Sequence, residues 1–102
     1  MEKLANALRN AKAFECYARA AEQGHAGAQG NLGMCYLEGT GVGKDAKRAV
    51  KWLRKGAENG DLPAQLTLAG CYRDGTGVRK DHEMAQEWLH KALTEAPPKG
   101  AL

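Results

Sequence analysis

The sequence predicts an all-α protein in which pairs of helices stack into an α/α superhelix. Two observations lead to this fold class. Residues that favour strands are scarce, since the 102-residue chain has no isoleucine, little valine or threonine and much alanine. The sequence also repeats itself at a fixed spacing, which is typical of stacked helical units.

The repeat has a period of 36 residues. When residues 64–91 are aligned under residues 28–55, 15 of 28 positions are identical. In the first copy these are Ala28, Gln29, Leu32, Cys35, Tyr36, Gly39, Thr40, Gly41, Val42, Lys44, Asp45, Ala49, Trp52, Leu53 and Lys55. A half copy lies upstream, so we expect two full repeats preceded by a single helix.

Each repeat is predicted to be a helix, a glycine loop and a second helix. In the first, helix A, Leu32 and Cys35 belong to one apolar stripe with steps of three to four residues. Gly39 is placed to end helix A in a left-handed conformation, and Asp45 to cap the second helix, helix B. Trp52 falls on the inner stripe of helix B, where its replacement by alanine should cost about 3–5 kcal/mol.

Five helices are expected in all, at residues 3–23, 26–38, 46–58, 62–74 and 82–95. They form one repeat array over residues 1–95, with a B helix at 3–23, repeat one at 26–58 and repeat two at 62–95. Two prolines then prevent the last helix from continuing, so residues 96–102 are expected to be a flexible tail.

Repeat one resembles the Sel-one-like repeat, a relative of the tetratricopeptide repeat (TPR) with a longer loop of the form G-x-G-V-x-x-D. The residues that carry this resemblance are Ala28 to Tyr36, Gly39 to Val42, Asp45, Ala49, Trp52 and Ala57. Repeat two matches through Leu68, Tyr72, Gly75, Gly77, Val78, Asp81, Ala85 and Trp88. The resemblance covers roughly residues 10–93.

The resemblance implies a TPR-like solenoid that acts as an adaptor or scaffold and binds a partner protein or peptide. The upstream copy departs from the family pattern because it lacks helix A and the glycine loop, and because Cys16 stands where the family has tryptophan. A disulfide-bearing branch of the family has cysteines where this chain has Ala21 and Ala28. The chain does not follow that branch.

Composition narrows the setting of the protein. The formal net charge of +3 is small for a dedicated nucleic-acid binder, so nucleic acid is not the expected partner. No apolar run approaches the ~18 residues that a membrane span needs, and the first twenty residues lack the apolar core of a secretory signal. The three cysteines have no metal-ligand spacing and are expected to be reduced and buried, as in a cytoplasmic protein.

No catalytic, cofactor or metal site is expected, and the chain is predicted not to be an enzyme. Serine is absent. The glycine loop is not a Walker loop, because Glu38 and Asp45 occupy the positions where that loop has its first glycine and its hydroxyl residue. His82 and His90 share a predicted helix, but they have no third ligand for zinc.

The A helices line the concave face in TPR-like arrays, so the resemblance places partner binding there. By register, this face is expected to carry Gly30, Met34, Leu37, Glu38, Leu66, Gly70, Arg73 and Asp74. The apolar members would contact a partner, with Glu38 and Arg73 as polar anchors. Glycine destabilises a helix interior, so Gly30 and Gly70 indicate either close helix contact or a floor left open for a guest chain.

A second surface is basic. Around one B helix the sequence gathers Lys44, Lys47, Lys51, Arg54 and Lys55. Such a run is usually a solvated outer face. The alternative function is an electrostatic docking module for an anionic surface or nucleic acid, which would bind less tightly as salt increases.

The first helix has apolar residues on two sides. Its stripe toward the array contains Cys16 and Tyr17, whereas Leu4, Leu8 and Ala11 fall on nearly the opposite side. This second stripe predicts a further neighbour. The neighbour would be a second copy of the chain, giving a homodimer, or another repeat of a longer array.

Overall fold

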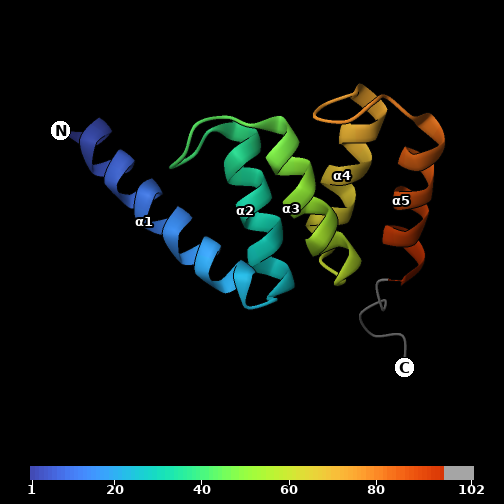
Figure 1. The fold of residues 1–102 in the computed structure, drawn as a ribbon, viewed down its shortest axis with the longest axis horizontal. Coiled ribbons are helices and arrows are strands. Elements are labelled where there is room, and N and C mark those ends of the chain that lie inside the picture. Colours follow the sequence, from blue (N-terminus) through green and yellow to red (C-terminus); the bar gives the residue numbers. More distant parts are fainter. Residues whose placement is uncertain (96–102) are drawn as a thin grey trace.

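The computed structural model describes residues 1–95, and this part of the chain is all-α (Figure 1). Its helices are α1 (Glu2–Glu22), α2 (Ala26–Glu38), α3 (Ala46–Glu58), α4 (Leu62–Asp74) and α5 (His82–Glu95). Four helices have the predicted bounds, and α1 begins and ends one residue early. The tail expected at residues 96–102 lies outside the described residues.

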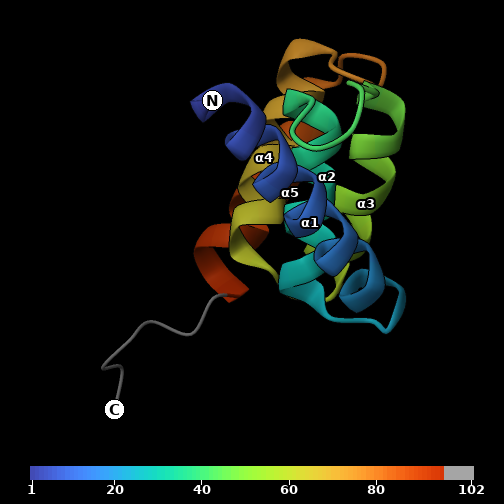
Figure 2. The same cartoon turned by 90° about the vertical axis from the view of Figure 1, so that its left-hand side faces the viewer.

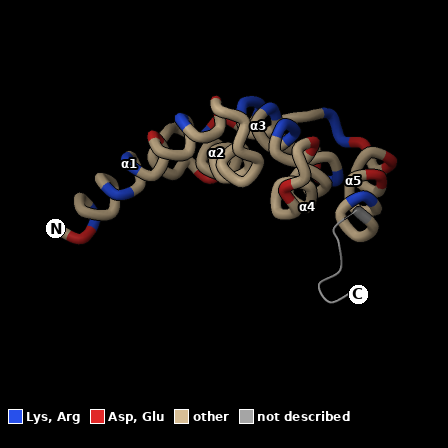
Figure 3. The backbone as a smooth tube through the Cα atoms, turned by 90° about the horizontal axis from the view of Figure 1, so that it is seen from below, with Lys and Arg blue, Asp and Glu red and all other residues tan. Residues whose placement is uncertain are grey.

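The helices stack in sequence order, each packed on the next, with a further contact between α2 and α4. Figure 3 shows α2 and α4 on one side of the row and α3 on the other. The view toward α1 in Figure 2 shows α2, α3 and α4 behind it, so α1 covers one end of the stack. This arrangement confirms the predicted α/α superhelix of two repeats and a leading B helix.

The ends of the helices follow the same local rules in both repeats. Gly39 and Gly75 adopt the left-handed conformation after α2 and α4, and each backbone N–H donates to a helix carbonyl at 2.8 Å. The carboxylates of Asp45 and Asp81 accept from the N–H three residues later, both at 3.1 Å. Equal geometry at positions 36 apart confirms that the repeat is structural.

Each glycine loop lies on the B helix that precedes its own repeat. A Cβ atom on Gly41 would collide with the carbonyl oxygen of Asn10 in α1, and one on Gly77 with that of Ala46 in α3. Both glycines have positive φ, +75° and +72°, which other residues rarely adopt. Asn10 and Ala46 are themselves 36 residues apart, so the same joint is made twice.

Two buried glutamines make a second joint between repeats. The Nε2 atom of Gln29 in α2 donates to the carbonyl of Ala21 in α1 at 3.2 Å, and Gln65 in α4 donates to Ala57 in α3 at 3.1 Å. Asn59 also donates to the Gln29 side chain at 2.8 Å. Each A helix thereby gives a second donor to a carbonyl near the end of the previous B helix, which also accepts from the backbone N–H of Gly24 or Gly60.

The core runs along the inner faces of the stack. Leu32, Leu53 and Leu68 are its largest fully buried side chains. Trp88 is buried as predicted, but Trp52 is only partly buried, with the Lys55 ammonium 4.6 Å from its ring centroid. The prediction that Trp52 is a fully buried core residue was therefore wrong. Its ring lies beneath the exposed side chain of Lys55 on the same helix.

The expectation that all three cysteines are buried was wrong for one of them. Cys35 and Cys71 are buried, whereas Cys16 in α1 is exposed. Its counterpart positions in α3 and α5 face an A helix of their own repeat, and no described helix precedes α1. Among the described helices α1 packs against α2 alone, and Cys16 lies exposed on it.

Candidate functional site

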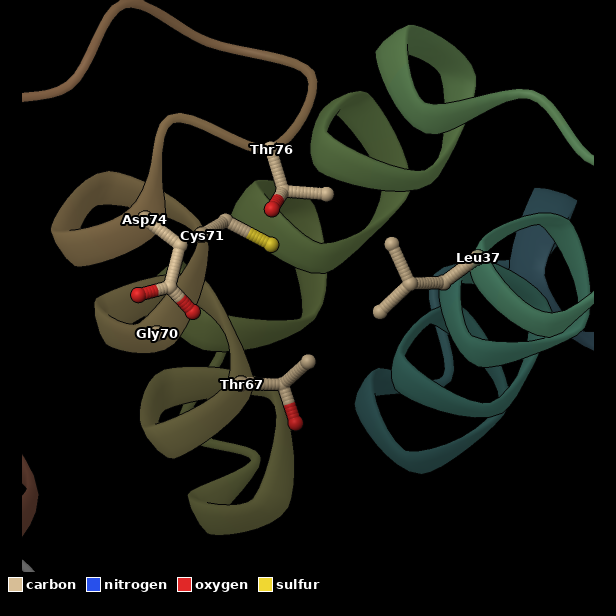
Figure 4. Close-up of a pocket in the computed structure, with 6 residues that line it drawn as sticks. All are labelled: Leu37, Thr67, Gly70, Cys71, Asp74 and Thr76. Carbon is tan, nitrogen blue, oxygen red and sulfur yellow. The ribbon is translucent and has the colours of Figure 1, made fainter.

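An open cavity of about 380 Å³ lies between the two A helices (Figure 4). Leu37 points into it from α2, across from side chains of α4 and of the glycine loop that follows. Its lining residues are Leu37, Thr67, Gly70, Cys71, Asp74 and Thr76. Its volume is within the range of small ligand pockets, ~300–1,000 Å³.

Gly70 keeps the floor of the cavity open. A Cβ atom at this position would meet only Nη2 of Arg73, at 4.0 Å, so helix packing does not require the glycine. Glycine in the interior of a helix costs about 0.5–1 kcal/mol relative to alanine. Among the described residues, no close approach of a neighbouring helix accounts for a glycine at this position.

A charged pair stands at the rim of the cavity. Arg73 donates from Nε and Nη2 to the two carboxylate oxygens of Asp74, each at 3.0 Å. This hydrogen bonding lowers the pKa of Asp74, so its carboxylate remains charged well below neutral pH. The pair is exposed to solvent.

The cavity thiol is not set up as a nucleophile. Burial raises the pKa of Cys71, and the nearby charge of Asp74 raises it further. Burial and Glu38 act in the same way on the pKa of Cys35. Since the thiolate is the reactive form, both side chains act as small apolar groups at neutral pH.

The structure brings together only some of the residues predicted for the concave face. Leu37, Gly70 and Asp74 line the cavity, and Arg73 binds Asp74 at its rim. Met34 is partly buried against the core, while Glu38 and Leu66 are exposed outside the lining.

Gly30 belongs to a helix contact and not to an open floor. It is buried, and a Cβ atom there would collide with the Asp61 carboxylate and crowd the Cβ of Ala64. Of the two readings that the sequence left open for the helix glycines, close contact holds for Gly30 and open space for Gly70.

Sequence reasoning missed Thr67, Cys71 and Thr76 as lining residues. Thr67, Gly70 or Cys71, and Asp74 form a stripe at steps of three to four residues. The predicted stripe was centred on Leu66 and Arg73. On α4 these positions are each one residue before the lining residues Thr67 and Asp74. A helical period fixes the spacing of a stripe but not its rotation toward a neighbour.

The basic residues of α3 lie on the other side of the stack, away from α2 and α4 (Figure 3). Lys44, Lys47, Lys51 and Lys55 are exposed. Arg54 is half-buried, donates to the hydroxyl of Tyr72 and lies 5.8 Å from the centre of its ring. Arg54 is therefore engaged inside the protein. The exposed basic residues are these lysines and Arg48, which pairs with Asp45.

Comparison with known proteins identifies the repeat. The family model of the Sel1 repeat matches residues 10–25, 26–61 and 62–95. The chain belongs to the Sel1 repeat family. Sel1 repeat proteins are generally scaffolds for protein interactions, and the repeat itself is non-catalytic.

Solved structures with the same fold agree with this membership. A protective antigen of uropathogenic Escherichia coli that displays an SLR fold is 41% identical, with a TM-score of 0.81 over 85% of this chain. A Sel1 repeat protein from Oxalobacter formigenes is 37% identical (TM-score 0.78, 84% of this chain), and cysteine rich protein B of Helicobacter pylori is 26% identical (TM-score 0.78, 84%).

The Sel1 repeats of this chain span only 19%, 35% and 65% of the lengths of those three proteins, respectively. No curated protein matches the chain.

This Sel1 array also bears on metal binding and on membrane insertion. Within residues 1–95 no group of three or more His, Cys, Asp or Glu side chains could hold a metal ion, and His82 and His90 are both exposed. Of the helices described, none has the length and apolar character needed to cross a membrane.

Proposed function

We propose that this chain is a non-catalytic interaction module that binds an extended segment of a partner protein across α2 and α4. The observation that carries the proposal is the open cavity above Gly70, into which the partner would insert one apolar side chain. The whole array of residues 1–95 would act as one unit, with repeat one at 26–58 and repeat two at 62–95.

The chemistry around the cavity supports an apolar anchor flanked by polar contacts. Leu37 supplies an apolar wall, and the hydroxyls of Thr67 and Thr76 can bond to a peptide backbone. The exposed Glu38 and the Arg73–Asp74 pair provide charges near the opening. A buried anchor with a polar rim is how small interfaces obtain most of their affinity.

The test uses the chain to select binders from a random peptide library, followed by titration of the selected peptides. Gly70→Leu fills the cavity and should weaken binding at least about tenfold, or ~1.4 kcal/mol. Gly43→Ala is the control, because a Cβ atom there meets nothing within 4 Å. Selected peptides that bind both variants equally well would contradict the proposed site.

Gly70→Ala adds a second measurement on the same site. Since alanine favours a helix and the space is open, we expect the free energy of unfolding to rise by about 0.5–1 kcal/mol while peptide affinity falls. A stability gain without any loss of affinity would mean that Gly70 serves no ligand.

A second candidate function is electrostatic docking through the lysines on α3 and in the loop directly before it, favoured by the exposure of Lys44, Lys47, Lys51 and Lys55. It predicts binding to anionic vesicles or to duplex DNA that weakens steeply between about 50 and 200 mM salt. Because the stripe lies away from the cavity, Gly70→Leu would leave this binding unchanged.

The proposed compartment is the cytoplasm. Support comes from the thiols, an odd number with none paired in the structure, since extracellular domains of this size usually carry disulfides.

A further inference from the structure

The two ends of the array expose complementary surfaces. In the middle of the array, α3 is covered by the next repeat: Val50 underlies Gly77 of the following loop, and the Ala57 carbonyl accepts from Gln65 of α4. These contacts involve Ala46, Val50 and Ala57 of α3. Leu53 falls on the same stripe and also packs against Gly33 of α2, and Val50, Leu53 and Ala57 are buried.

The equivalent residues of α5, 36 positions later, are exposed. They are His82, Gln86, Leu89 and Leu93, here called the open α5 face. Leu89 is 38% exposed and Leu93 is 75% exposed, whereas Leu53 and Ala57 are 0% and 2% exposed. This face therefore occupies the positions that, on α3, pack against the A helix of the next repeat. No described residue covers it.

At the other end, α1 extends beyond the array. Asn10 is the counterpart of Ala46, the first residue of α3, so residues 2–9 are additional helix that projects from the stack (Figure 1). This extension carries Leu4 and Leu8, which are 65% and 58% exposed, and Ala11 follows one turn later. We call these three residues the α1 stripe.

The α1 stripe has the spacing of an A helix. Leu4, Leu8 and Ala11 lie at steps of four and three residues. In α4 the buried Ala64, Leu68 and Cys71 have the same two steps, and α4 packs against α3. The α1 stripe therefore has the spacing of apolar residues expected of a helix that packs on the open α5 face.

Charge also matches between the two ends. The first twelve residues carry Lys3, Arg9 and Lys12 against a single Glu2. Helix α5 carries Glu83 and Glu87 against Lys91, and the loop before it adds Arg79, Lys80 and Asp81. Pairing α1 with α1 would bring the basic residues of two copies together, and pairing α5 with α5 would do the same for the glutamates. Charge therefore favours contact between unlike ends.

We propose that the chain self-associates head to tail, with the α1 stripe of one copy packed on the open α5 face of a second copy. Such a contact is heterologous, so every assembled pair still has one free α1 stripe and one free α5 face. Association then continues with concentration or closes into a ring. The contact involves one helix on one helix, below the ~800 Å² per partner of a stable interface, so the affinity is modest.

The experiment is sedimentation equilibrium of the full 102-residue chain from about 5 to 500 µM, a range suited to micromolar dissociation constants. The variants are Leu8→Glu and Leu93→Glu, both at exposed positions where folding tolerates a charge. Leu66→Glu is the matched control, because Leu66 is 44% exposed on α4, away from both surfaces.

Head-to-tail contact predicts that the wild type and Leu66→Glu gain mass beyond the dimer as concentration rises, while each of the other two variants stays monomeric. An equimolar mixture of Leu8→Glu and Leu93→Glu should form a 1:1 dimer and stop there, because each supplies the surface that the other lacks. A wild type that is monomeric at every concentration overturns the proposal. So does loss of association in Leu8→Glu alone without rescue in the mixture, which would indicate α1 pairing with α1.

Discussion

The inner B helix α3 and the outer B helices α1 and α5 share one register but have different numbers of neighbours. Helix α3 packs against α2 and α4, whereas α1 packs on α2 and α5 on α4. Ala49 of α3 is fully buried, and its counterpart Ala13 in α1 is only partly buried. In a stack of this kind, the number of adjacent helices decides whether a position belongs to the core.

The difference in burial between inner and outer B helices is largest at Leu53 of α3 and Leu89 of α5, which are identical residues at equivalent positions. Replacing Leu53 by alanine leaves a cavity in the core and should lower the free energy of unfolding by about 2–5 kcal/mol. Leu89→Ala removes a side chain that is 38% exposed, so we expect a loss under about 1 kcal/mol. Urea unfolding followed by circular dichroism measures both.

Similar losses for the two variants would show that neighbour number does not control burial. That result would also weaken the idea that the α5 face is open, because Leu89 would then be covered by something that the described residues do not include.

The next largest effect is expected at the loop joints. Gly77→Ala forces a methyl group into the carbonyl of Ala46 at a positive φ, and should cost about 1–3 kcal/mol. Gly41→Ala makes the same collision with Asn10, but α1 is held on one side only and can shift, so its cost should be smaller. Thermal unfolding compares the two, and Gly43→Ala should leave the midpoint unchanged.

A larger loss for Gly41→Ala than for Gly77→Ala would reverse the comparison. It would mean that the end of the array is more rigidly packed than its middle.

The smallest effect concerns the three thiols. Cys16 on α1 is exposed, whereas Cys35 and Cys71 are buried and have raised pKa values. At pH 8 we expect iodoacetamide to modify Cys16 more than about tenfold faster than either buried thiol, a difference of roughly 1.4 kcal/mol or more in barrier. Mass spectrometry over time measures the three rates. Because a raised pKa keeps less thiolate present at a given pH, the gap should narrow as pH rises.

The helices and their ends could be predicted from the sequence because they depend on local chemistry. Gly39 and Asp45 act through their own backbone and the three or four residues nearest to them, and each has a copy 36 residues later. Because the sequence contains two copies of the repeat, a helix boundary assigned in one copy can be compared with the same position in the other. The fold class and the family followed from these signals and are confirmed.

Details of the candidate site could not be predicted because they depend on contacts between repeats. The glycines of α2 and α4 look alike in sequence, yet the space beside Gly30 is filled by Asp61, the residue directly before α4, while the space beside Gly70 is open. The Asp61 carboxylate caps α4 by accepting from the N–H of Ala64, and nothing local in the sequence indicates that it also lies against α2. The exposure of Cys16 likewise depends on what stands beside α1, which no periodicity records.

The joint made by Gly41 and Gly77 has a consequence for how such chains change length. Each repeat contacts the preceding B helix through atoms at equivalent positions. A duplicated stretch of 36 residues would therefore pack against the same kind of surface as the original copy does. Unequal recombination within the gene could then lengthen or shorten the protein without inventing any new packing, and each added unit would raise stability by a similar increment.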